Sequence, residues 1–389
     1  MRTKVKVTRI GLDGHKTFGS ATGRGADGGI VWRERLDYRD RGKLREQLAR
    51  WPKGTPVVLE ATFGYGWQCD ELAGAGLEPH LANCRKVAGW RKARGLPKSN
   101  RIDADLLSEL LGEKSRWWEV WLAPPEVRDQ REWLRYRMAL VMIQTGLKNR
   151  IHAVLHRHGI VWEGSDLFGV KGRRFLSLLV VPNDATLSES AQATLKGYLQ
   201  LLDHVRRQVA KVTWQFRKQL RKLSTGDRLR TLPGISWILA YTIVAEVGRI
   251  DRFKSARHLA SYSLLAPRAD DSGEPDEGDP KGRHLGRAGR RTLKWAWIEA
   301  ARGAAKRGRF REIYDRVTDG NKRNRNRGYI VVAHELCRIA YVLWKKDVDY
   351  REDRPARPGR RSEVQDSRPG TGQPDPAMVA AVHGRLQAS

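Results

Sequence analysis

The sequence predicts an α/β domain with a mixed sheet, followed by two mainly helical regions. Near-alternating apolar patterns and helical patterns follow one another along the first 111 residues. Two long segments with apolar residues at helical spacing come next, and the rest is mostly helical up to about residue 350. Residues 351–389 hold 5 of the 16 prolines and show little apolar periodicity, so we predict that this tail is disordered.

The first region begins with three predicted strands and then alternates helices with strands. Its elements in order are strands Val5–Asp13, Phe18–Thr22 and Ile30–Leu36, helix Arg41–Trp51, strand Pro56–Glu60, helix Gly66–Ala75, strand Glu78–Asn83 and helix Asp103–Leu111. A glycine-rich turn separates the second strand from the third. This order predicts a mixed sheet and is that of RNase H-like (RuvC-like) nucleases.

The second region holds two segments that are far longer than ordinary globular helices. They cover Glu126–His158, after a Pro-Pro pair, and Leu187–Leu223. Either an antiparallel coiled-coil hairpin that forms oligomers or two packed core helices would fit this pattern. We therefore expect four parts: residues 1–118, 119–225, 226–350 and 351–389.

The charge of the chain favours a polyanionic partner. It carries 74 Lys and Arg against 44 Asp and Glu, a net charge of +30, which disfavours an ordinary small-molecule enzyme. Lys281–Arg327 alone holds 16 Lys and Arg against four Asp and Glu. No apolar run of 18 residues and no apolar signal-peptide core are seen. We expect a soluble cytoplasmic protein that binds nucleic acid and no membrane.

Carboxylates stand where predicted strands end. Asp13 closes the first strand and Glu60 closes the fourth, so the two can lie a few ångströms apart in one sheet. Such carboxylates repel unless a cation bridges them, and Mg²⁺ or Mn²⁺ is the natural bridge. Asp103 and Asp105, at a predicted helix start, offer a third ligand. A solvated strand end or a helix-cap carboxylate is the alternative for each residue.

The third region carries features suited to a nucleic-acid backbone. Leu232-Pro-Gly-Ile235 looks like the turn of a helix-hairpin-helix, in which Gly234 would leave backbone N–H groups free for phosphate. An ordinary tight turn between core helices is the alternative. The basic candidates for phosphate contact, interspersed with glycines, are Lys281, Arg283, Arg287, Arg290, Arg291 and Lys294.

Several motifs, in one order over roughly residues 5–310, resemble a known family. In the first region they are Gly11-Leu-Asp-Gly-His-Lys16, Val58-Leu-Glu-Ala61 and Lys98-Ser-Asn-Arg-Ile-Asp-Ala104. In the third they include Leu232-Pro-Gly-Ile235, Leu265-Ala-Pro-Arg268, Ser272-Gly273 and Gly286-Arg-Ala-Gly-Arg-Arg-Thr-Leu293. They resemble the N-terminal RuvC-like DEDD domain and the C-terminal transposase domain of insertion-sequence transposases related to the Piv invertase.

The resemblance implies a bacterial, nucleoid-associated recombinase that acts on donor and target DNA under the guidance of a bridge RNA. It also implies a dimer or tetramer joined partly through the long helices. A metal-binding acidic quartet would assist a serine nucleophile, which matches Ser272. Asp13, Glu60 and Asp103 match three members of the quartet, whereas the fourth position holds Asn100.

Asp105 is a second candidate for the fourth position. Positions three apart on a helix differ by about 60° in azimuth, but positions two apart differ by about 160°. Asp105 could therefore replace Asn100 only if it lies before the helix begins or if the backbone changes locally. Asn100 could still offer a carbonyl oxygen to Mg²⁺, as a weaker ligand than a carboxylate.

Two other functions fit parts of the pattern. A structure-specific endonuclease of the Holliday-junction resolvase type needs the acids and the metal but no covalent serine. A non-enzymatic helix-hairpin-helix protein would only bind nucleic acid, and the asparagine at position 100 favours it.

Overall fold

The structure is a computed structural model that describes residues 6–113, 115–181, 186–266, 289–320, 322 and 324–352. The chain divides into two compact units. The first comprises Met1–Gln219 with Tyr241–Arg249, and the second comprises Leu220–Ala240 with Ile250–Ser389. Within the described ranges, no helix combines the length and the apolar character that a membrane span requires.

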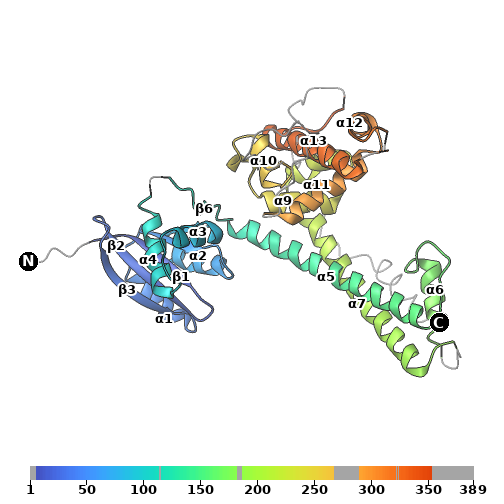
Figure 1. Ribbon diagram of the computed structural model, residues 1–389, viewed down its shortest axis with the longest axis horizontal. Coiled ribbons are helices and arrows are strands. Elements are labelled where there is room, and N and C mark those ends of the chain that lie inside the picture. Colours follow the sequence, from blue (N-terminus) through green and yellow to red (C-terminus); the bar gives the residue numbers. More distant parts are fainter. Residues whose placement is uncertain are drawn as a thin grey trace, which may run out of the picture. The chain divides into compact units, whose positions relative to one another are not determined.

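A six-stranded mixed sheet forms the N-terminal part of the first unit (Figure 1). Its order is β3-β2-β1-β4-β5-β6, in which β1, β4 and β5 are parallel and the other pairings are antiparallel. The strands are β1 Val7–Gly14, β2 Phe18–Gly25, β3 Ile30–Asp37, β4 Pro56–Glu60, β5 Glu78–Ala82 and β6 Glu119–Val120. The expected α/β class with a mixed sheet is confirmed.

Two details of the sheet differ from the prediction. β2 continues to Gly25 through part of the predicted glycine-rich turn, because Gly23 and Arg24 pair with β1 on one side and with β3 on the other. The two-residue strand β6 was not predicted, since it exists only through its pairing of Val120 with Leu81. Long-range pairing, rather than local propensity, forms both segments.

Helices cover both faces of the sheet because side chains alternate along each strand. Val57 and Leu59 of β4 enter one core, which also holds residues of the first two helices, whereas Val58 enters the other. The helices are α1 Arg41–Ala49 and α2 Tyr65–Gly74 on the first face, and α3 Cys84–Ala93 and α4 Asn100–Leu110 on the second. Helix α3 escaped prediction because Val87 is its only buried residue.

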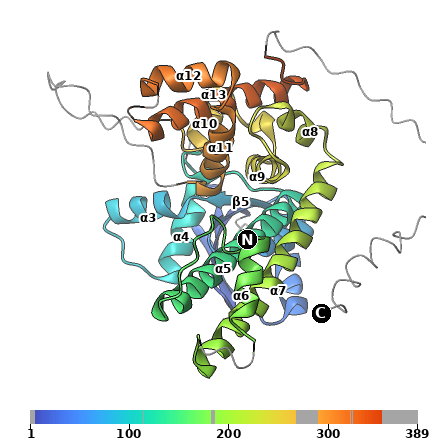
Figure 2. The ribbon, with the colours of Figure 1, turned by 90° about the vertical axis from the view of Figure 1, so that its right-hand side faces the viewer.

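Two long helices continue the first unit, as the sequence predicted. Helix α5 spans Pro125–Arg157 and α7 spans Glu189–Leu220, with the short α6 (Val170–Leu178) between them. Arg137 early in α5 donates a 3.0 Å hydrogen bond to Thr213 late in α7. Near the other end of α5, the ring of His152 contacts Phe168, whose carbonyl accepts from Arg206 of α7. The two helices therefore run antiparallel, side by side in Figures 1 and 2.

The second unit is helical in its described residues (Figure 2). Helix α13 packs against α8, α10, α11 and α12 and so forms the centre of this unit. Its buried Cys337 lies beside Ser263, whose hydroxyl accepts a 3.2 Å hydrogen bond from the Trp297 indole. The helices are α8 Ser224–Thr231, α9 Trp237–Val247, α10 Ala256–Tyr262, α11 Arg291–Ala304, α12 Gly308–Thr318 and α13 Arg325–Lys346, and α9 continues into the first unit.

Candidate active site

The register of the sheet brings two of the predicted acids side by side. The parallel pairing of β1 with β4 matches Leu12 with Leu59, and Asp13 and Glu60 are the next residue on each strand. Neighbouring strands lie about 4.8 Å apart, so both carboxylates emerge at the carboxyl edge of the parallel strands. In α/β folds this edge is where ligands bind.

Helix α4 adds the third acid because it packs very closely on β1. A Cβ at Gly11 would lie 2.2 Å from the Ala104 carbonyl oxygen and 2.2 Å from the Ser108 nitrogen. Only glycine allows this approach. Ser99 caps the helix by accepting from the Ile102 N–H, and Asp103 follows in the first turn. The helix packs on β1, the strand that carries Asp13.

The three carboxylates lie close enough for their charges to interact. Burial raises the pKa of Asp13, and the charge of Asp103 raises it further. Burial also raises the pKa of Glu60, followed by the charges of Asp13 and Asp103. Asp13 and Glu60 are therefore harder to ionise in the folded chain than in water.

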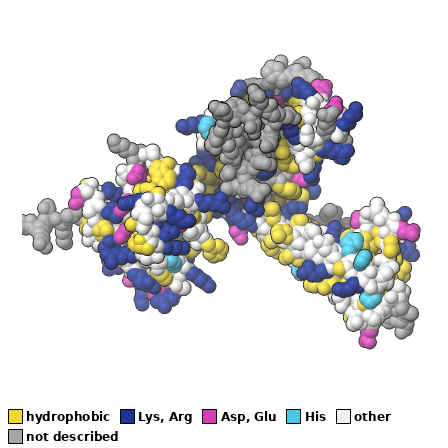
Figure 3. All heavy atoms as spheres, in the orientation of Figure 1, with side chains coloured by type: hydrophobic (Ala, Val, Ile, Leu, Met, Phe, Trp, Pro, Cys, Tyr) yellow, Lys and Arg dark blue, Asp and Glu magenta, His cyan; other side chains and the backbone are white. Residues whose placement is uncertain are grey.

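Cationic and polar groups partly offset this repulsion. The Nε2 atom of His15 lies 3.0 Å from Asp13 Oδ2, and the Arg91 Nε lies 3.5 Å from Asp103 Oδ1. Lys98 lowers the pKa of both Asp13 and Glu60, and a hydrogen bond from the Cys84 thiol does the same for Glu60. The cluster is thus an acidic centre with a basic rim, and Figure 3 shows Lys and Arg side chains over the sheet-bearing part of the chain.

The carboxylate oxygens of Asp13, Glu60 and Asp103 are of the chemical type that binds a hard divalent cation. Carboxylate oxygens are the ligands that Mg²⁺ and Mn²⁺ prefer, and a cation would relieve the repulsion that raises the pKa of Asp13 and Glu60. Over the described ranges, however, no group of three or more His, Cys, Asp or Glu side chains is placed to hold a metal ion. Asp13 and Asp103 would have to turn from His15 and Arg91 toward such an ion.

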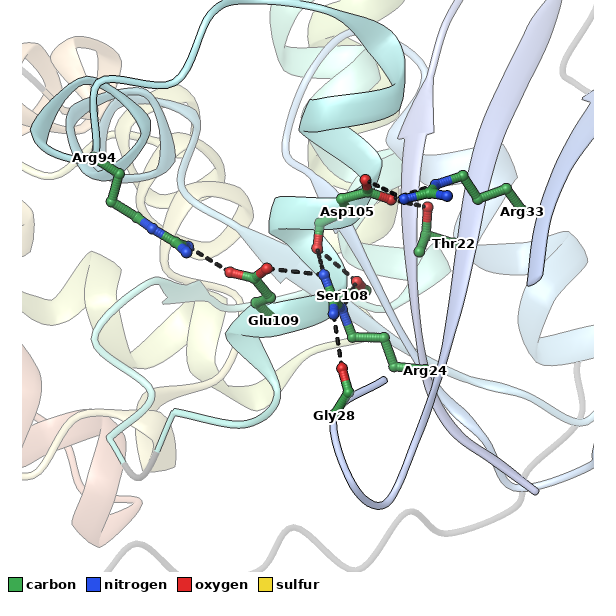
Figure 4. A network of polar contacts seen from close by, with 8 residues as sticks. All are labelled: Thr22, Arg24, Gly28, Arg33, Arg94, Asp105, Ser108 and Glu109. Atoms are coloured by element: carbon green, nitrogen blue, oxygen red, sulfur yellow. Dashed lines mark hydrogen bonds and ion pairs between the residues drawn. The ribbon is translucent and has the colours of Figure 1, made fainter. Parts of the chain in front are cut away.

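Asp105 belongs to a different network of polar contacts, which Figure 4 shows. Its carboxylate accepts hydrogen bonds from the Thr22 hydroxyl at 2.7 Å and from Arg33 at 3.0 and 2.8 Å. Burial acts to raise its pKa, but the bonds from Arg33 and Thr22 outweigh burial, and the net pKa is lowered. Asp105 is part of helix α4 and comes two residues after Asp103, so the two side chains leave the helix on different sides. The side that carries Asp105 faces β2 and β3.

A buried arginine holds the same face of α4 against β2. Arg24 donates to the Ser108 hydroxyl at 2.7 Å, to Glu109 at 2.8 Å and to the Asp105 carbonyl at 3.3 Å (Figure 4). These bonds fix the position of the helix from which Asp103 projects.

Asn100 is exposed and is the first residue of α4, one turn before Asp103. Residues three apart on a helix are neighbours on its surface. Helical geometry therefore groups Asn100, rather than Asp105, with Asp103.

The predicted backbone-binding residues of the second unit are only partly described. At Gly234, φ is +80° and an added Cβ would lie 2.1 Å from the Ala300 carbonyl oxygen, so this glycine packs closely on α11. Arg290 donates a 3.2 Å hydrogen bond to the Tyr262 hydroxyl, Arg291 is exposed, and burial lowers the pKa of Lys294. Outside the described residues lie Ser272, Lys281, Arg283 and Arg287.

Sequence reasoning missed three polar neighbours of the acids. Lys98 is the first residue of the motif that contains Asp103, and this proximity in sequence could have suggested a cation near the acids. Arg91 and Cys84 lie on α3, which was not predicted, so no local signal connected them with the site.

An acidic cluster at the carboxyl edge of a mixed sheet, in so basic a chain, is the arrangement expected of an enzyme that acts on nucleic acid. Sequence comparison matches residues 226–315 to a family described as "Transposase IS116/IS110/IS902 family". The transposase for insertion sequence element IS1111A of Coxiella burnetii is 24% identical over 226 residues, 57% of this chain and 58% of that protein.

The transposase for insertion sequence element IS1328 of Yersinia enterocolitica is 24% identical over 347 residues, 87% of this chain and 96% of that protein. The family description and both relatives carry the name transposase. The enzyme class that the sequence predicted is thus borne out by what the chain is similar to.

Proposed function

We propose that this chain is the transposase of an insertion sequence, an enzyme that cuts and rejoins DNA. The observation that supports this proposal is that Asp13 and Glu60 follow paired residues of neighbouring parallel strands, and that the charge of Asp103, 90 residues after Asp13 in the chain, acts on both. The order β3-β2-β1-β4-β5 with β2 antiparallel to β1 supports an RNase H-like domain. The similarity to named transposases supports the reaction class.

Asp13, Glu60 and Asp103 would hold Mg²⁺ or Mn²⁺, with Asn100 as an uncharged fourth ligand. Such an ion, when bound, stabilises the charge that develops on the phosphate. The residues of the chain prepare the site for it. His15 and Arg91 orient the carboxylates of Asp13 and Asp103 while the site is empty of substrate, and Lys98 adds a positive charge that attracts the phosphodiester.

Ser272 is the proposed nucleophile, and this part of the proposal depends on the resemblance of its motif. Its hydroxyl oxygen would form a bond to the phosphorus of the DNA backbone while one phosphorus–deoxyribose oxygen bond breaks. The serine proton passes to a base and the departing oxygen takes up a proton. Six acidic residues lie between positions 270 and 279, and a bound cation would offset their repulsion of the phosphate.

A bridge RNA would pair the donor DNA with the target DNA, and two or four copies would assemble through the long helices. The excess of basic residues along Lys281–Arg327 supports contact with such backbones. The enzyme would work in the bacterial cytoplasm at the nucleoid.

One assay separates this proposal from the two alternatives. Protein, guide RNA and cognate DNA are incubated with Mg²⁺, and protein–DNA adducts that resist denaturation are sought. The proposal requires an adduct with the wild type and none with Ser272→Ala. Cutting that depends on metal but leaves no adduct would point to a resolvase. DNA binding without any cutting would leave a binding protein.

A further inference from the structure

The loop between β4 and α2 holds an aromatic side chain in solvent beside the acids. Phe63 is 103% exposed, more than any other large apolar side chain among the described residues. It comes three residues after Glu60, at the carboxyl edge of the parallel strands.

Hydrogen bonds hold the backbone of this loop just before Phe63. The Ala61 N–H donates to the Ala82 carbonyl at 2.9 Å, and the Thr62 N–H donates to the Glu60 carbonyl at 2.7 Å. On the other side, Gly64 directly precedes α2 as its N-cap residue, with a φ of +90°, a conformation that side-chain-bearing residues rarely adopt. Hydrogen bonds therefore constrain the chain before Phe63, and the helix α2 begins two residues after it.

The aromatic residues that follow Phe63 in the chain pack against the hydrophobic core of the domain. Tyr65 and Trp67, two and four residues further on, pack against the hydrophobic core under α1 and α2. Phe63 alone of the three points away. A single exposed apolar residue is ordinary on a protein surface. Phe63 differs by its position, three residues after the Glu60 carboxylate.

The cations around the neighbouring acids favour a nucleic acid over an apolar protein surface as the partner of this loop. Lys98 is near enough to Glu60 to lower its pKa, and Arg91 lies 3.5 Å from Asp103. The backbone of a nucleic acid would meet these cations, and an aromatic ring offers its face to a base. Bases inside a duplex already stack on each other, so the partner must be a base that is unpaired or flipped out.

We propose that Phe63 stacks on an unpaired nucleobase next to the phosphodiester that the acidic cluster acts on. This inference rests on the proposed function and deepens it, because it makes the enzyme prefer DNA that is opened at the reaction point. Aromatic stacking on one base changes binding roughly 5- to 100-fold.

Photo-crosslinking tests the contact without any need for cutting. The probe is a forked DNA duplex that carries one 5-iododeoxyuridine at the junction, bound to the full chain without divalent cation. Irradiation links iodouracil to an aromatic ring stacked on it, and the linked peptide is identified by mass spectrometry. We expect the peptide that contains Thr62–Phe63.

Variants of Phe63 distinguish aromatic stacking from a general apolar contact and from an effect on folding. Phe63→Trp should keep the crosslink and the affinity for the fork, whereas Phe63→Leu and Phe63→Ala should both weaken fork binding roughly tenfold and leave duplex binding unchanged. The matched control is Val170→Ala, since Val170 is 91% exposed at the start of α6. Equal melting temperatures would show that all variants fold.

Three results would overturn the inference: a crosslink elsewhere, a Leu variant that binds the fork as the wild type does, or a loss of oligomers with fork binding intact. The last would mean that the ring contacts a second copy. If the crosslink forms but no protein–DNA adduct ever does under cutting conditions, the stacking inference stands and the proposed function fails.

Discussion

The Ala104 carbonyl oxygen stands 2.2 Å from the place that a Cβ of residue 11 would occupy. Gly11 therefore decides how close α4 comes to β1, and that distance decides whether Asp103 reaches Asp13. A glycine two residues before an acid is part of the acidic site without bearing any functional group.

Replacing this glycine should disturb both folding and the site. Gly11→Ala forces the strand and the helix apart, because backbone atoms block the methyl group, and overpacking of this kind costs roughly 1–3 kcal/mol or more of unfolding free energy. Urea denaturation measures the loss. The control is Gly89→Ala in α3. An added Cβ there would meet no neighbouring group within 4 Å, so alanine should stabilise the helix by about 0.5–1 kcal/mol.

The acidic cluster should make the chain less stable as pH rises from about 4 toward 7. Burial and the neighbouring acids raise the pKa of Glu60. The unfolded chain therefore loses this proton at lower pH than the folded chain does, so stability falls as pH rises through this window. Glu60→Gln should be more stable than the wild type at pH 7, and the advantage should shrink toward pH 4.

A glutamate with the opposite shift provides the control for this pH series. The hydrogen bond from Arg45 lowers the pKa of Glu71, so its contribution to stability is present at pH 7 and is lost as pH falls through its folded pKa. Glu71→Gln should be less stable than the wild type at pH 7 and equal to it in strong acid. Parallel curves for both variants would contradict the assignment of the shifts.

Divalent cations should stabilise the wild type through the same carboxylates. A ligand at 100 times its Kd adds about 2.7 kcal/mol to the free energy of unfolding. We expect Mg²⁺ or Mn²⁺ to raise the melting temperature of the wild type and of Asp105→Asn at pH 7, but not that of Glu60→Gln. Calorimetric scans with and without EDTA check this. A full shift in Glu60→Gln would remove Glu60 from the proposed ligands.

Asp105 should act on stability through Arg33. Asp105→Asn keeps the size of the side chain but removes the charge that Arg33 binds with two nitrogens, at a cost of about 1–2 kcal/mol. A double-mutant cycle with Arg33→Met should give a coupling energy of roughly 1 kcal/mol. A coupling near zero, together with loss of the metal-induced shift in Asp105→Asn, would instead make Asp105 a ligand.

Arg131 should be the most costly arginine to lose from α5. Its side chain is 2% exposed, and it donates to the carbonyls of Ala245 and Glu246 at 2.9 Å each. Arg131→Met leaves those acceptors and the buried Glu246 carboxylate behind, so we expect a loss of about 3–5 kcal/mol. Arg135→Met, at an exposed position one turn later, should change stability by less than about 0.5 kcal/mol. Equal losses in the two variants would contradict this role.

Local sequence patterns were sufficient for most of the sheet and its acids. The strand over Pro56–Glu60 was predicted with the bounds that the structure has, because a short apolar run closed by a charged residue has few other uses in an α/β domain. Asp13 and Glu60 stood at predicted strand ends for the same reason. The two long helices followed from apolar spacing that stays periodic for more than 30 residues.

Patterns that depend on distant partners could not be predicted. Helix α3 has almost no apolar stripe and begins where the Asn83 side chain accepts from two backbone N–H groups. The different surroundings of Asp103 and Asp105 depend on which neighbours their helix meets. Arg33 and Thr22, some 70 to 85 residues away, engage Asp105 and not Asp103.

The sequence by itself determined the identity and chain order of the first five strands, the surplus of positive charge and the acids near the strand ends, because these follow from local periodicity and composition. Only the tertiary structure decided which acids share a site. That choice depends on the parallel register of β1 with β4 and on the close approach of α4 at Gly11, and both are set by packing between segments far apart in the chain.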